Sequence, residues 1–382
     1  MRTLHVAALP FPSPQGTQAL LHALLSAQAA EHETHLLCYG HGVGVVDGAY
    51  AVHRSPAPRL LRSLRSGPAL GKPWLDLALA LRLRSLERTL APAIVIAHHV
   101  EAAACALLVC RAPVLFVAHT SLAEELPSYF PHSLRAPLRA LGRASDRLLV
   151  RTASGTCAVS PLLAQLLAEQ SERPSAELPL PWPCATPIDS AERAAARAEL
   201  GFSSEHEVAL YAGNLDAYQG LDVLLAACAE LRVERPGFRW LLATEAPTAA
   251  FVSALRRRGL GELAIFARLD SESARRRAYA AADLALVPRR AAGGLPIKLL
   301  DAWARGVPVV AARLALAGLQ HAPCAEVVED DRPGSWRRAI SQLLHDRSLA
   351  SERAHHARLY VAREHDPASA SARFSAQLRS ML

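Results

Sequence analysis

The sequence predicts an α/β protein made of two doubly wound domains, each a parallel sheet with helices on both faces. Three observations favour this class. Short apolar runs alternate with longer helical patterns along the whole chain, which is typical of parallel sheets covered by helices. The 382 residues exceed one ordinary core at about 150 residues per domain. Four prolines crowd into 177–187, a stiff stretch that cannot join a sheet interior and so predicts a connector.

In the first half, short apolar runs predict strands and helical patterns separate them. The strands are expected at Leu4–Ala8, His35–Tyr39, Ala93–Ala97, Val114–Ala118 and Cys157–Val159. Between the first two, the pattern over 17–30 places four leucines on one face of a helix. Ser160 and Pro161 form an N-cap and first-turn pair, which predicts a helix after the fifth strand.

The second half repeats this alternation. Strands are expected at Val208–Ala212, Arg239–Ala243, Ala264–Ala267, Leu284–Val287 and Val307–Ala311, with helices at Leu221–Glu230, Thr248–Arg258, Glu272–Ala282 and Ile297–Arg305. From Pro333 onward the pattern is helical, and Asp366 and Pro367 open a last helix. We therefore expect domains at 1–180 and 181–360, and a C-terminal helix within 361–382 that is a candidate to pack back on the first domain.

Composition narrows the class of protein. Hydrophobic residues make up 51% of the chain and charged residues 20%, which predicts a globular protein. The seven cysteines are odd in number and form no C-x-x-C pair, which argues against a disulfide framework or zinc knuckle and favours a reducing compartment. The apolar run at the amino terminus is short and broken by prolines, and no stretch approaches the roughly 20 apolar residues of a spanning helix. A cytoplasmic location is therefore expected.

The chain is basic, and its positive charge is almost entirely arginine. The net charge is +7, and only Lys72 and Lys298 are lysines. Such a balance indicates attraction to phosphate groups, and it makes each lysine informative. Two amphipathic arginine patterns are candidates for contact with an anionic membrane surface, although solvated helix faces in an arginine-rich protein explain them equally well: Arg59, Arg62 and Arg65, then Arg135, Arg139, Arg143 and Arg147.

Residues 283–312 carry the strongest chemical pattern. A strand ends at Pro288, a loop with Arg289 and Arg290 follows, and a helix opens after two glycines with Lys298 in its first turn. Backbone N–H groups at a helix start, close approach at glycine and an ammonium group together favour an anion, so this segment predicts a phosphate site. The alternative is an ordinary strand-to-helix turn with incidental charge.

Residues 211–225 form a second strand-to-helix segment. The strand runs into Gly213, the loop carries Asn214, Asp216 and Gln219, and a helix begins after Gly220. Because these loop side chains are two amides and one acid, a phosphate here would be held by amide dipoles.

These segments resemble the donor half of glycosyltransferase family 4, the retaining enzymes of GT-B fold. The likeness rests on GNLDAYQGLDVLL, FARLDSE, DLALVP and GGLPIKLLDAWARGVPVVA, in that order. The first half is similar to the acceptor-side domain of the family at PFPSPQGTQ, AHTSLAEELPSY and CAVSP. The resemblance implies two Rossmann-like domains facing a central cleft, and transfer of a sugar from a nucleotide-diphosphate sugar with retention and without a metal.

The sequence departs from the family at positions that bind the donor. Where the family usually has an Arg and a Lys after the first donor-domain strand, this chain has Asn214 and Gln219. Where the family has two glutamates, this chain has Gly293 and Asp301. Lys298 and the Arg289–Arg290 pair are candidates to supply the missing positive charge.

The resemblance assigns roles to particular residues. His119 and Asp301 are the expected catalytic pair, with His119 facing the donor sugar and Asp301 on the ribose. His99, Glu101 and Glu124 are the acceptor-side candidates, with His98 beside them. The expected donor-binding residues are Gly16, Gly213, Asn214, Gln219, Arg268, Arg290, Gly293, Gly294, Leu295, Pro296, Ile297, Lys298 and Asp301.

The sequence therefore predicts a hexosyltransferase-type glycosyltransferase. Its expected partners are a nucleotide sugar as co-substrate and a glycan, lipid-linked or small-molecule acceptor, as in polysaccharide biosynthesis, with no further cofactor and no metal. The alternative from another class is a GT-B scaffold or sugar-nucleotide-binding protein that has lost catalysis, which the missing charges favour. An epimerase would need cleft carboxylates for acid–base work, and a nucleic-acid binder is disfavoured by the 5% aromatic content.

Overall fold

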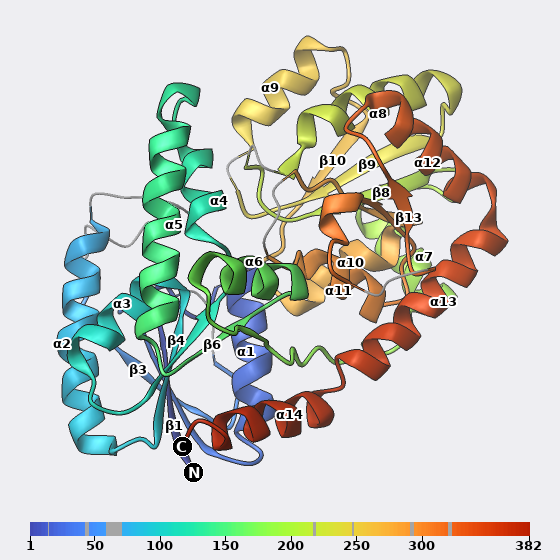
Figure 1. Ribbon diagram of the computed structural model, residues 1–382. Coiled ribbons are helices and arrows are strands. Elements are labelled where there is room, and N and C mark those ends of the chain that lie inside the picture. The colour runs from blue at the N-terminus through green and yellow to red at the C-terminus, as the bar shows by residue number, and fades with distance from the viewer. Residues whose placement is uncertain are drawn as a thin grey trace. The chain divides into compact units, whose positions relative to one another are not determined.

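The computed structural model describes residues 1–13, 15–42, 46–58, 71–216, 219–246, 248–290, 294–319 and 323–382. The chain forms two compact units. The first comprises Met1–Pro181 and Pro367–Leu382 with the short segment Ala292–Leu295, and the second comprises Trp182–Ala291 and Pro296–Asp366. Each unit contains one parallel sheet with helices on its faces (Figure 1).

The sheet of the first unit has seven strands in the order β3-β2-β1-β4-β5-β6-β7. Their bounds are β1 (Arg2–Ala7), β2 (Glu33–Cys38), β3 (Ala51–Arg54), β4 (Ile94–His98), β5 (Val114–Ala118), β6 (Gly155–Ala158) and β7 (Ala176–Glu177). Every neighbouring pair is parallel. The strand order reverses between β1 and β4, where Ala7 lies opposite His98. Ligands of doubly wound sheets bind beyond the carboxyl ends of the strands at such a reversal.

Helices cover both faces of this sheet. They are α1 (Gly16–Gln28), α2 (Lys72–Leu90), α3 (His99–Val109), α4 (Leu122–Glu125), α5 (Arg135–Thr152), α6 (Pro161–Ser171) and α14 (Pro367–Arg379). Helix α1 buries the leucine face that the sequence predicts, and Ser160 Oγ caps α6 by accepting from the Leu163 N–H at 3.2 Å. The last helix, α14, packs on α1, where Ser371 Oγ donates to the Ala27 carbonyl at 3.1 Å.

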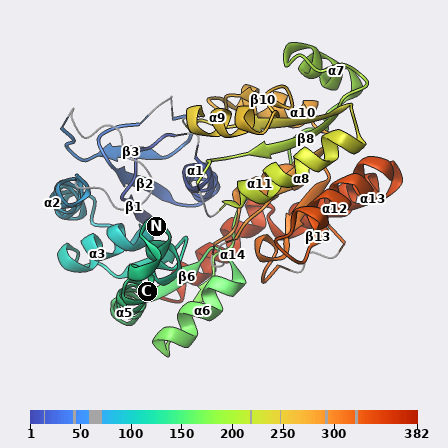
Figure 2. The same ribbon diagram turned by 90° about the horizontal axis from the view of Figure 1, so that it is seen from above.

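The sheet of the second unit has six parallel strands in the order β10-β9-β8-β11-β12-β13. The strands are β8 (Glu207–Ala212), β9 (Phe238–Ala243), β10 (Ala264–Ala267), β11 (Leu284–Val287), β12 (Val309–Ala312) and β13 (Glu326–Val328). The helices around it in the described residues are α7 (Ser190–Glu199), α8 (Leu221–Glu234), α9 (Ala249–Arg257), α10 (Glu272–Ala281), α11 (Ile297–Ala304), α12 (Pro333–His345) and α13 (Arg347–Glu364). Helix α8 packs on α12 and α10 on α7 (Figure 2), and the strand order reverses between β8 and β11.

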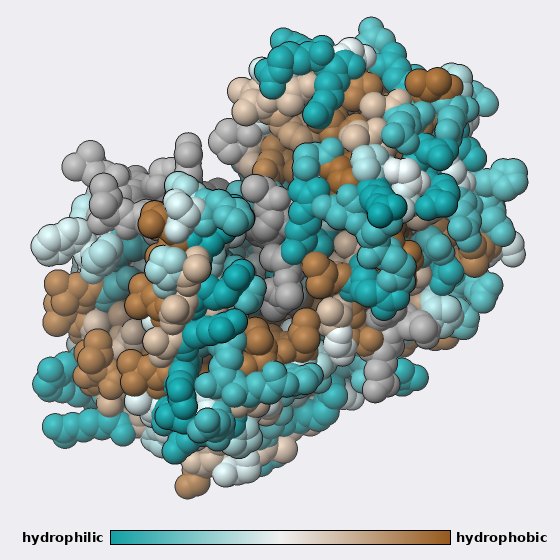
Figure 3. Space-filling view, turned by 45° about the horizontal axis from the view of Figure 1, so that its top comes forward, coloured by the Kyte–Doolittle hydropathy of each residue, from teal (hydrophilic) through white to brown (hydrophobic). Residues whose placement is uncertain are grey.

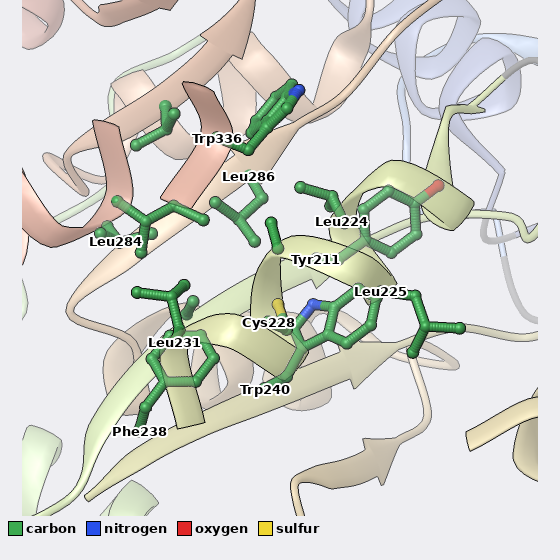
Figure 4. Packing of buried hydrophobic residues seen from close by; sticks show 14 of the residues in the cluster. Tyr211, Leu224, Leu225, Cys228, Leu231, Phe238, Trp240, Leu284, Leu286 and Trp336 are labelled. Carbon is green, nitrogen blue, oxygen red and sulfur yellow. The ribbon is translucent and has the colours of Figure 1, made fainter. Parts of the chain in front are cut away.

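The main core of the second unit lies between its sheet and the pair α8 and α12. Trp240 from β9 and Trp336 from α12 are both buried in it (Figure 4). Leu224 and Cys228 of α8 fill the space between them and the strands. This apolar packing holds the start of α8 beside the end of β8, where the polar loop of the candidate site begins.

The predicted architecture of two parallel-sheet α/β units is confirmed, and each predicted strand lies within about two residues of an observed one. The sequence analysis missed β3, β7 and β13. All three lie at sheet edges and have two to four residues, so they carry little apolar pattern. The arginine pattern Arg59, Arg62 and Arg65 lies outside the described residues.

Two further observations concern the helices and the cysteines. None of the helices in the described ranges is long and apolar enough to cross a membrane. All seven cysteines are free thiols, and five of them are buried.

Candidate active site

Lys298 is the centre of a polar network at the carboxyl end of the second sheet. Its Nζ donates to Gln219 Oε1 at 2.8 Å and to the Tyr211 hydroxyl at 3.0 Å. The ammonium also lies 4.1 Å from the centre of the Tyr211 ring. The structure thus brings the helix that follows β11 into contact with the loop that follows β8.

Two loop amides extend this network. Gln219 Nε2 donates to Asn214 Oδ1 at 2.7 Å, and Asn214 Nδ2 donates to Asp216 Oδ2 at 2.6 Å. Three residues predicted separately from the sequence, Asn214, Gln219 and Lys298, are therefore adjacent in space. Tyr211 was not predicted. Tyr211 is a buried residue of β8 whose side chain carries a hydroxyl group. Its position two residues before Gly213 was the sequence signal that could have identified it.

Gly213 permits the approach of Lys298. Its φ of +144° is a conformation that L side chains rarely adopt, and a Cβ there would lie 2.9 Å from Lys298 Nζ. Gly220, with a φ of +70°, begins α8 from the left-handed conformation. The backbone conformation therefore favours glycine at both positions. At Gly213, the Lys298 ammonium occupies the space that a side chain would need.

The charge of Lys298 is destabilised in the protein without ligand. Burial and the Arg289 guanidinium hold the pKa of Lys298 well below its usual value, and the Asp216 carboxylate only partly opposes them. An anion bound beside this nitrogen would favour its charged form. A role for this network in binding a phosphate stays a prediction.

Six consecutive residues at the start of α11, residues 293–298, were predicted to bind the donor. Gly294 precedes the buried Leu295 and Pro296, and the helix begins at Ile297 with Pro296 as its N-cap. Lys298 consequently stands in the first turn, as the sequence predicts. Gly293 lies outside the described residues.

Arg290 and Arg268 lie apart from this network. Arg290 is held by two carboxylates at 2.5 Å each, Asp222 and Asp331. Arg268 is exposed and pairs loosely with Glu245 and Asp270 at 3.5 and 3.6 Å. Neither arginine hydrogen-bonds to the Lys298 network within the described part of the chain, so a role for them in donor binding stays a prediction.

Asp301 lies one turn further along α11 and is 6% exposed. Its Oδ1 accepts from Arg305 Nε at 3.0 Å, and its Oδ2 lies 3.8 Å from Arg275. Burial raises the pKa of Asp301 although both arginines oppose the rise. The carboxylate is thus engaged by guanidinium groups of its own unit, and hydrogen bonding to a ribose stays a prediction.

In the first unit, three histidines meet at the ends of β4 and β5. His119 follows β5 directly, its ring stacks on His99 at 4.3 Å between centres, and its Nε2 lies 3.0 Å from His98 Nδ1. Burial holds the pKa of His119 and of His98 well below the usual value. Burial thus favours the neutral form of the His119 imidazole over the charged form.

The acceptor-side candidates are partly brought together. Glu101, in the first turn of α3, accepts from Lys72 Nζ of α2 at 3.1 Å, and the Tyr39 hydroxyl donates to Asp76 of α2 at 2.5 Å. Lys72, Tyr39 and Asp76 were not predicted as site residues. The scarcity of lysine was the available signal for Lys72, because the chain has only two lysines.

Glu124 does not join these residues. It lies 3.7 Å from Arg139 of α5. Its neighbour Glu125 is instead the residue whose charge, together with Glu101, opposes the lowering of the pKa of His99 by burial. Gly16, the remaining predicted residue, is the exposed first residue of α1 after the β1 loop.

Among the residues that the structure describes, no group of three or more His, Cys, Asp and Glu side chains could hold a metal ion.

Comparison with known proteins decides the family. The model for Glycosyltransferase Family 4 matches residues 14–177, and the model for Glycosyl transferases group 1 matches residues 206–346. The chain belongs to glycosyltransferase family 4. The first match spans β2 to β7 and the second spans β8 to β13, so membership rests on both units.

Curated relatives share part of the family 4 chain. A D-inositol 3-phosphate glycosyltransferase from Segniliparus rotundus is 32% identical over 162 residues, which cover 40% of this chain and 35% of the relative. The protein of that name from Mycobacterium sp. strain KMS is 30% identical over 249 residues, 61% of this chain and 54% of the relative. The alignments thus span about half the length of these relatives or less.

Solved structures share the fold over the full length. Sucrose-phosphate synthase from Thermosynechococcus elongatus superposes with a TM-score of 0.82 at 16% identity, covering 100% of this chain and 99% of the other. HepE from Anabaena, solved in complex with UDP-glucose, gives a TM-score of 0.78 at 15% identity and covers both chains completely. The family 4 chain therefore has the GT-B fold.

Proposed function

We propose that this protein is a retaining, metal-independent glycosyltransferase that moves a sugar from a nucleotide-diphosphate sugar to an acceptor. The observation that carries the proposal is the Lys298 network. A lysine in the first turn of a helix, with its charge destabilised and a glycine in contact with its Nζ, is suited to a diphosphate. Family membership and the UDP-glucose complex of HepE support a nucleotide sugar as the ligand.

In the proposed donor site, Lys298 pairs with the diphosphate while the start of α11 supplies backbone N–H groups. Asn214 and Gln219, which hold each other and the lysine, contribute amide dipoles where other family members carry charge. Asp301 is assigned to the ribose hydroxyls. To accept hydrogen bonds from the ribose, the Asp301 carboxylate must give up part of its hydrogen bonding with Arg305.

The proposed chemistry places few demands on protein side chains. In front-face retaining transfer, the leaving diphosphate takes the acceptor proton as the acceptor oxygen bonds to the anomeric carbon and the sugar–phosphate bond breaks. His119, neutral because it is buried, is assigned to a donor-sugar hydroxyl. The enzyme supplies position and electrostatics.

We assign the acceptor to the polar groups at the carboxyl end of the first sheet, namely His99, the Lys72–Glu101 pair and the Tyr39–Asp76 pair. The curated relatives are named for D-inositol 3-phosphate, so this phosphorylated polyol is the first acceptor to assay. Glycans and lipid-linked sugars are the other classes.

We also assign α5 to contact with an anionic membrane surface. Leu134, Leu141 and Leu148 are exposed at heptad spacing on or beside it, and Arg135 and Arg143 form no ion pair with any described residue. Hydrophilic and hydrophobic residues lie next to one another on the face of the first unit seen in Figure 3. Such a helix is suited to adsorption where lipid-linked acceptors lie.

The second candidate is a sugar-nucleotide-binding protein without catalysis. It is favoured by the amides at 214 and 219 and by the internal pairing of Arg290 and Asp301. The two candidates differ in turnover rather than in nucleotide binding. Release of free nucleoside diphosphate in the presence of D-inositol 3-phosphate or another acceptor would favour the enzyme.

A thermal-shift titration with UDP, GDP, ADP, TDP and their sugars tests the donor site that both candidates require. A nucleotide at about 100 times its Kd stabilises the folded state by about 2.7 kcal/mol. We expect one nucleotide to raise Tm selectively, and Lys298→Ala to abolish the shift. Lys72→Ala, which removes the other lysine, retains it. No shift with any nucleotide would contradict the proposed donor site.

A further inference from the structure

Four side chains of the first unit form a continuous line of hydrogen bonds, which begins at the end of α1, passes through β1 and β4 and ends just after β5. Gln28, the last residue of α1, has its Oε1 2.8 Å from His5 Nε2. His5 Nδ1 lies 3.0 Å from Nε2 of His98, the last residue of β4. His98 Nδ1 lies 3.0 Å from His119 Nε2. All four side chains are buried.

The Gln28 amide atom that meets His5 sets which ring nitrogen of each histidine carries hydrogen. A neutral imidazole has one N–H donor and one acceptor nitrogen. In the structure Gln28 Oε1 faces His5, and Gln28 Nε2 is buried without a hydrogen-bond partner among the described residues; the opposite amide orientation would reverse every donor and acceptor in the line. With Oε1 as the acceptor, His5 carries its hydrogen on Nε2 and offers Nδ1 as a lone pair. His98 must then donate from Nε2 to His5, and His119 must donate from Nε2 to His98. His119 Nδ1, which has no hydrogen-bond partner among the described residues, is left as an acceptor.

Geometry and burial both support three neutral rings. The rings of His5 and His98 are 16° from parallel with centres 5.3 Å apart, which allows an in-plane N–H···N contact. Burial lowers the pKa of His5 to about 4, although the hydrogen bond to Gln28 opposes the change. The charged groups nearest the outer end, Lys72, Glu101 and Glu125, surround His99, whose ring stacks on His119.

We propose that Gln28, His5 and His98 are positioning residues that hold His119 in the tautomer with hydrogen on Nε2, so that Nδ1 accepts a hydrogen bond from a substrate hydroxyl. This inference rests on the function proposed above. The line of hydrogen bonds ends at the Gln28 carboxamide, which takes up no proton near neutral pH. The line therefore orients the His119 imidazole and does not carry a proton away from it. His119 Nδ1 thereby selects a substrate hydroxyl that is positioned to donate a hydrogen bond to it.

The tautomer can be measured without any activity. Nitrogen-15 NMR of the full chain labelled on histidine separates protonated from unprotonated ring nitrogens, and signals missing in His119→Gln identify His119. We expect Nε2 protonated and Nδ1 unprotonated at pH 7.5 for His119, His98 and His5. A protonated Nδ1 on His119 would overturn the proposal.

Two variants of Gln28 test the cause. In Gln28→Leu the acceptor is lost, so we expect both tautomers of His119 and a kcat lower by about tenfold, with KM for the donor within about twofold. Gln28→Glu keeps an acceptor oxygen, and we expect it to retain the wild-type tautomer and most of kcat. Gln18→Leu is the same change on the same helix. Because Gln18 hydrogen-bonds to the Pro10 carbonyl and to Gln15, and not to His5, His98 or His119, we expect it to leave the His119 spectrum unchanged.

The outcomes separate this inference from the proposed function. A single unchanged tautomer in folded Gln28→Leu would refute the role of Gln28, whatever the activity. If Gln28→Leu does not fold, a changed tautomer in Gln28→Glu would refute that role instead. The expected spectra together with absent sugar transfer would leave the tautomer assignment standing and contradict only the proposed function.

Discussion

Lys298 Nζ and Gln219 Oε1 lie 2.8 Å apart, so the lysine at the start of α11 and the glutamine just before α8 hold each other at the carboxyl end of the second sheet. In family members that carry a charged residue at the Gln219 position, two cations would meet here. In this chain one cation and one amide meet instead. The Gln219 position thus adds no positive charge beside Lys298, and the pKa of Lys298 is lowered by burial and by the neighbouring cation Arg289.

This arrangement predicts that nucleotide binding depends on pH. Burial and Arg289 lower the pKa of Lys298 in the free protein, and a bound diphosphate raises it, so binding takes up a proton. Affinity for the selected nucleotide is expected to be highest below the lowered pKa of the free protein. It falls as pH rises toward the pKa of the complex. Isothermal titration calorimetry in two buffers of different ionisation enthalpy measures the uptake. A binding enthalpy that is equal in both buffers across the pH range would contradict the prediction.

Gly213→Ala is expected to weaken nucleotide binding and to destabilise the fold. The new Cβ would lie 2.9 Å from Lys298 Nζ, and a φ of +144° costs a non-glycine residue about 1–3 kcal/mol. Urea denaturation measures the second effect. The matched control is Gly334→Ala in the first turn of α12, where a Cβ meets nothing within 4 Å. A Gly213→Ala protein as stable as Gly334→Ala would contradict the strain at Gly213.

Asp283 is expected to be the most sensitive charged residue of the second unit. Its buried carboxylate lies within 2.8 Å of Arg193, Arg197 and Arg347 and accepts from the Val208 N–H at 2.7 Å. Asp283→Ala leaves these groups unpaired, so we expect a loss of about 3–5 kcal/mol in the free energy of unfolding. Asp270→Ala, at an exposed pair, should cost less than about 1 kcal/mol. Similar midpoints in chemical denaturation for the two variants would contradict this ranking.

Charge reversal on α5 is expected to reduce binding to anionic vesicles. Each basic residue near such a surface contributes about 1 kcal/mol, so the double change Arg135→Glu and Arg143→Glu should weaken binding by well over tenfold at physiological salt. Cosedimentation with vesicles of phosphatidylcholine and phosphatidylserine measures it. Arg256→Glu with Arg257→Glu on α9 makes the same change of charge in the other unit. Equal loss in both double variants would indicate a non-specific charge effect and contradict a role for α5.

Much of the fold was predictable because local pattern and fold agree. Buried parallel strands are continuous apolar runs, and the helices between them carry one apolar face, so β8 to β12 and the leucine face of α1 could be located from the sequence. The edge strands β3 and β13 could not, because few of their residues are buried and hydrogen bonding to one neighbour defines them. Similarly, the spacing around Lys298 predicted a helix start next to an anion site.

The sequence by itself determined the fold class, the family resemblance, and the polar loop residues that follow β8 and precede α11. Only the tertiary structure decided which of those residues meet. It joined Lys298 to Gln219 across 79 positions, paired Arg290 and Asp301 with partners inside their own unit, and aligned His5 and His98 with His119. The physical reason is that hydrogen bonds and ion pairs depend on distances of about 3 Å between atoms, and sheet register and helix packing set those distances.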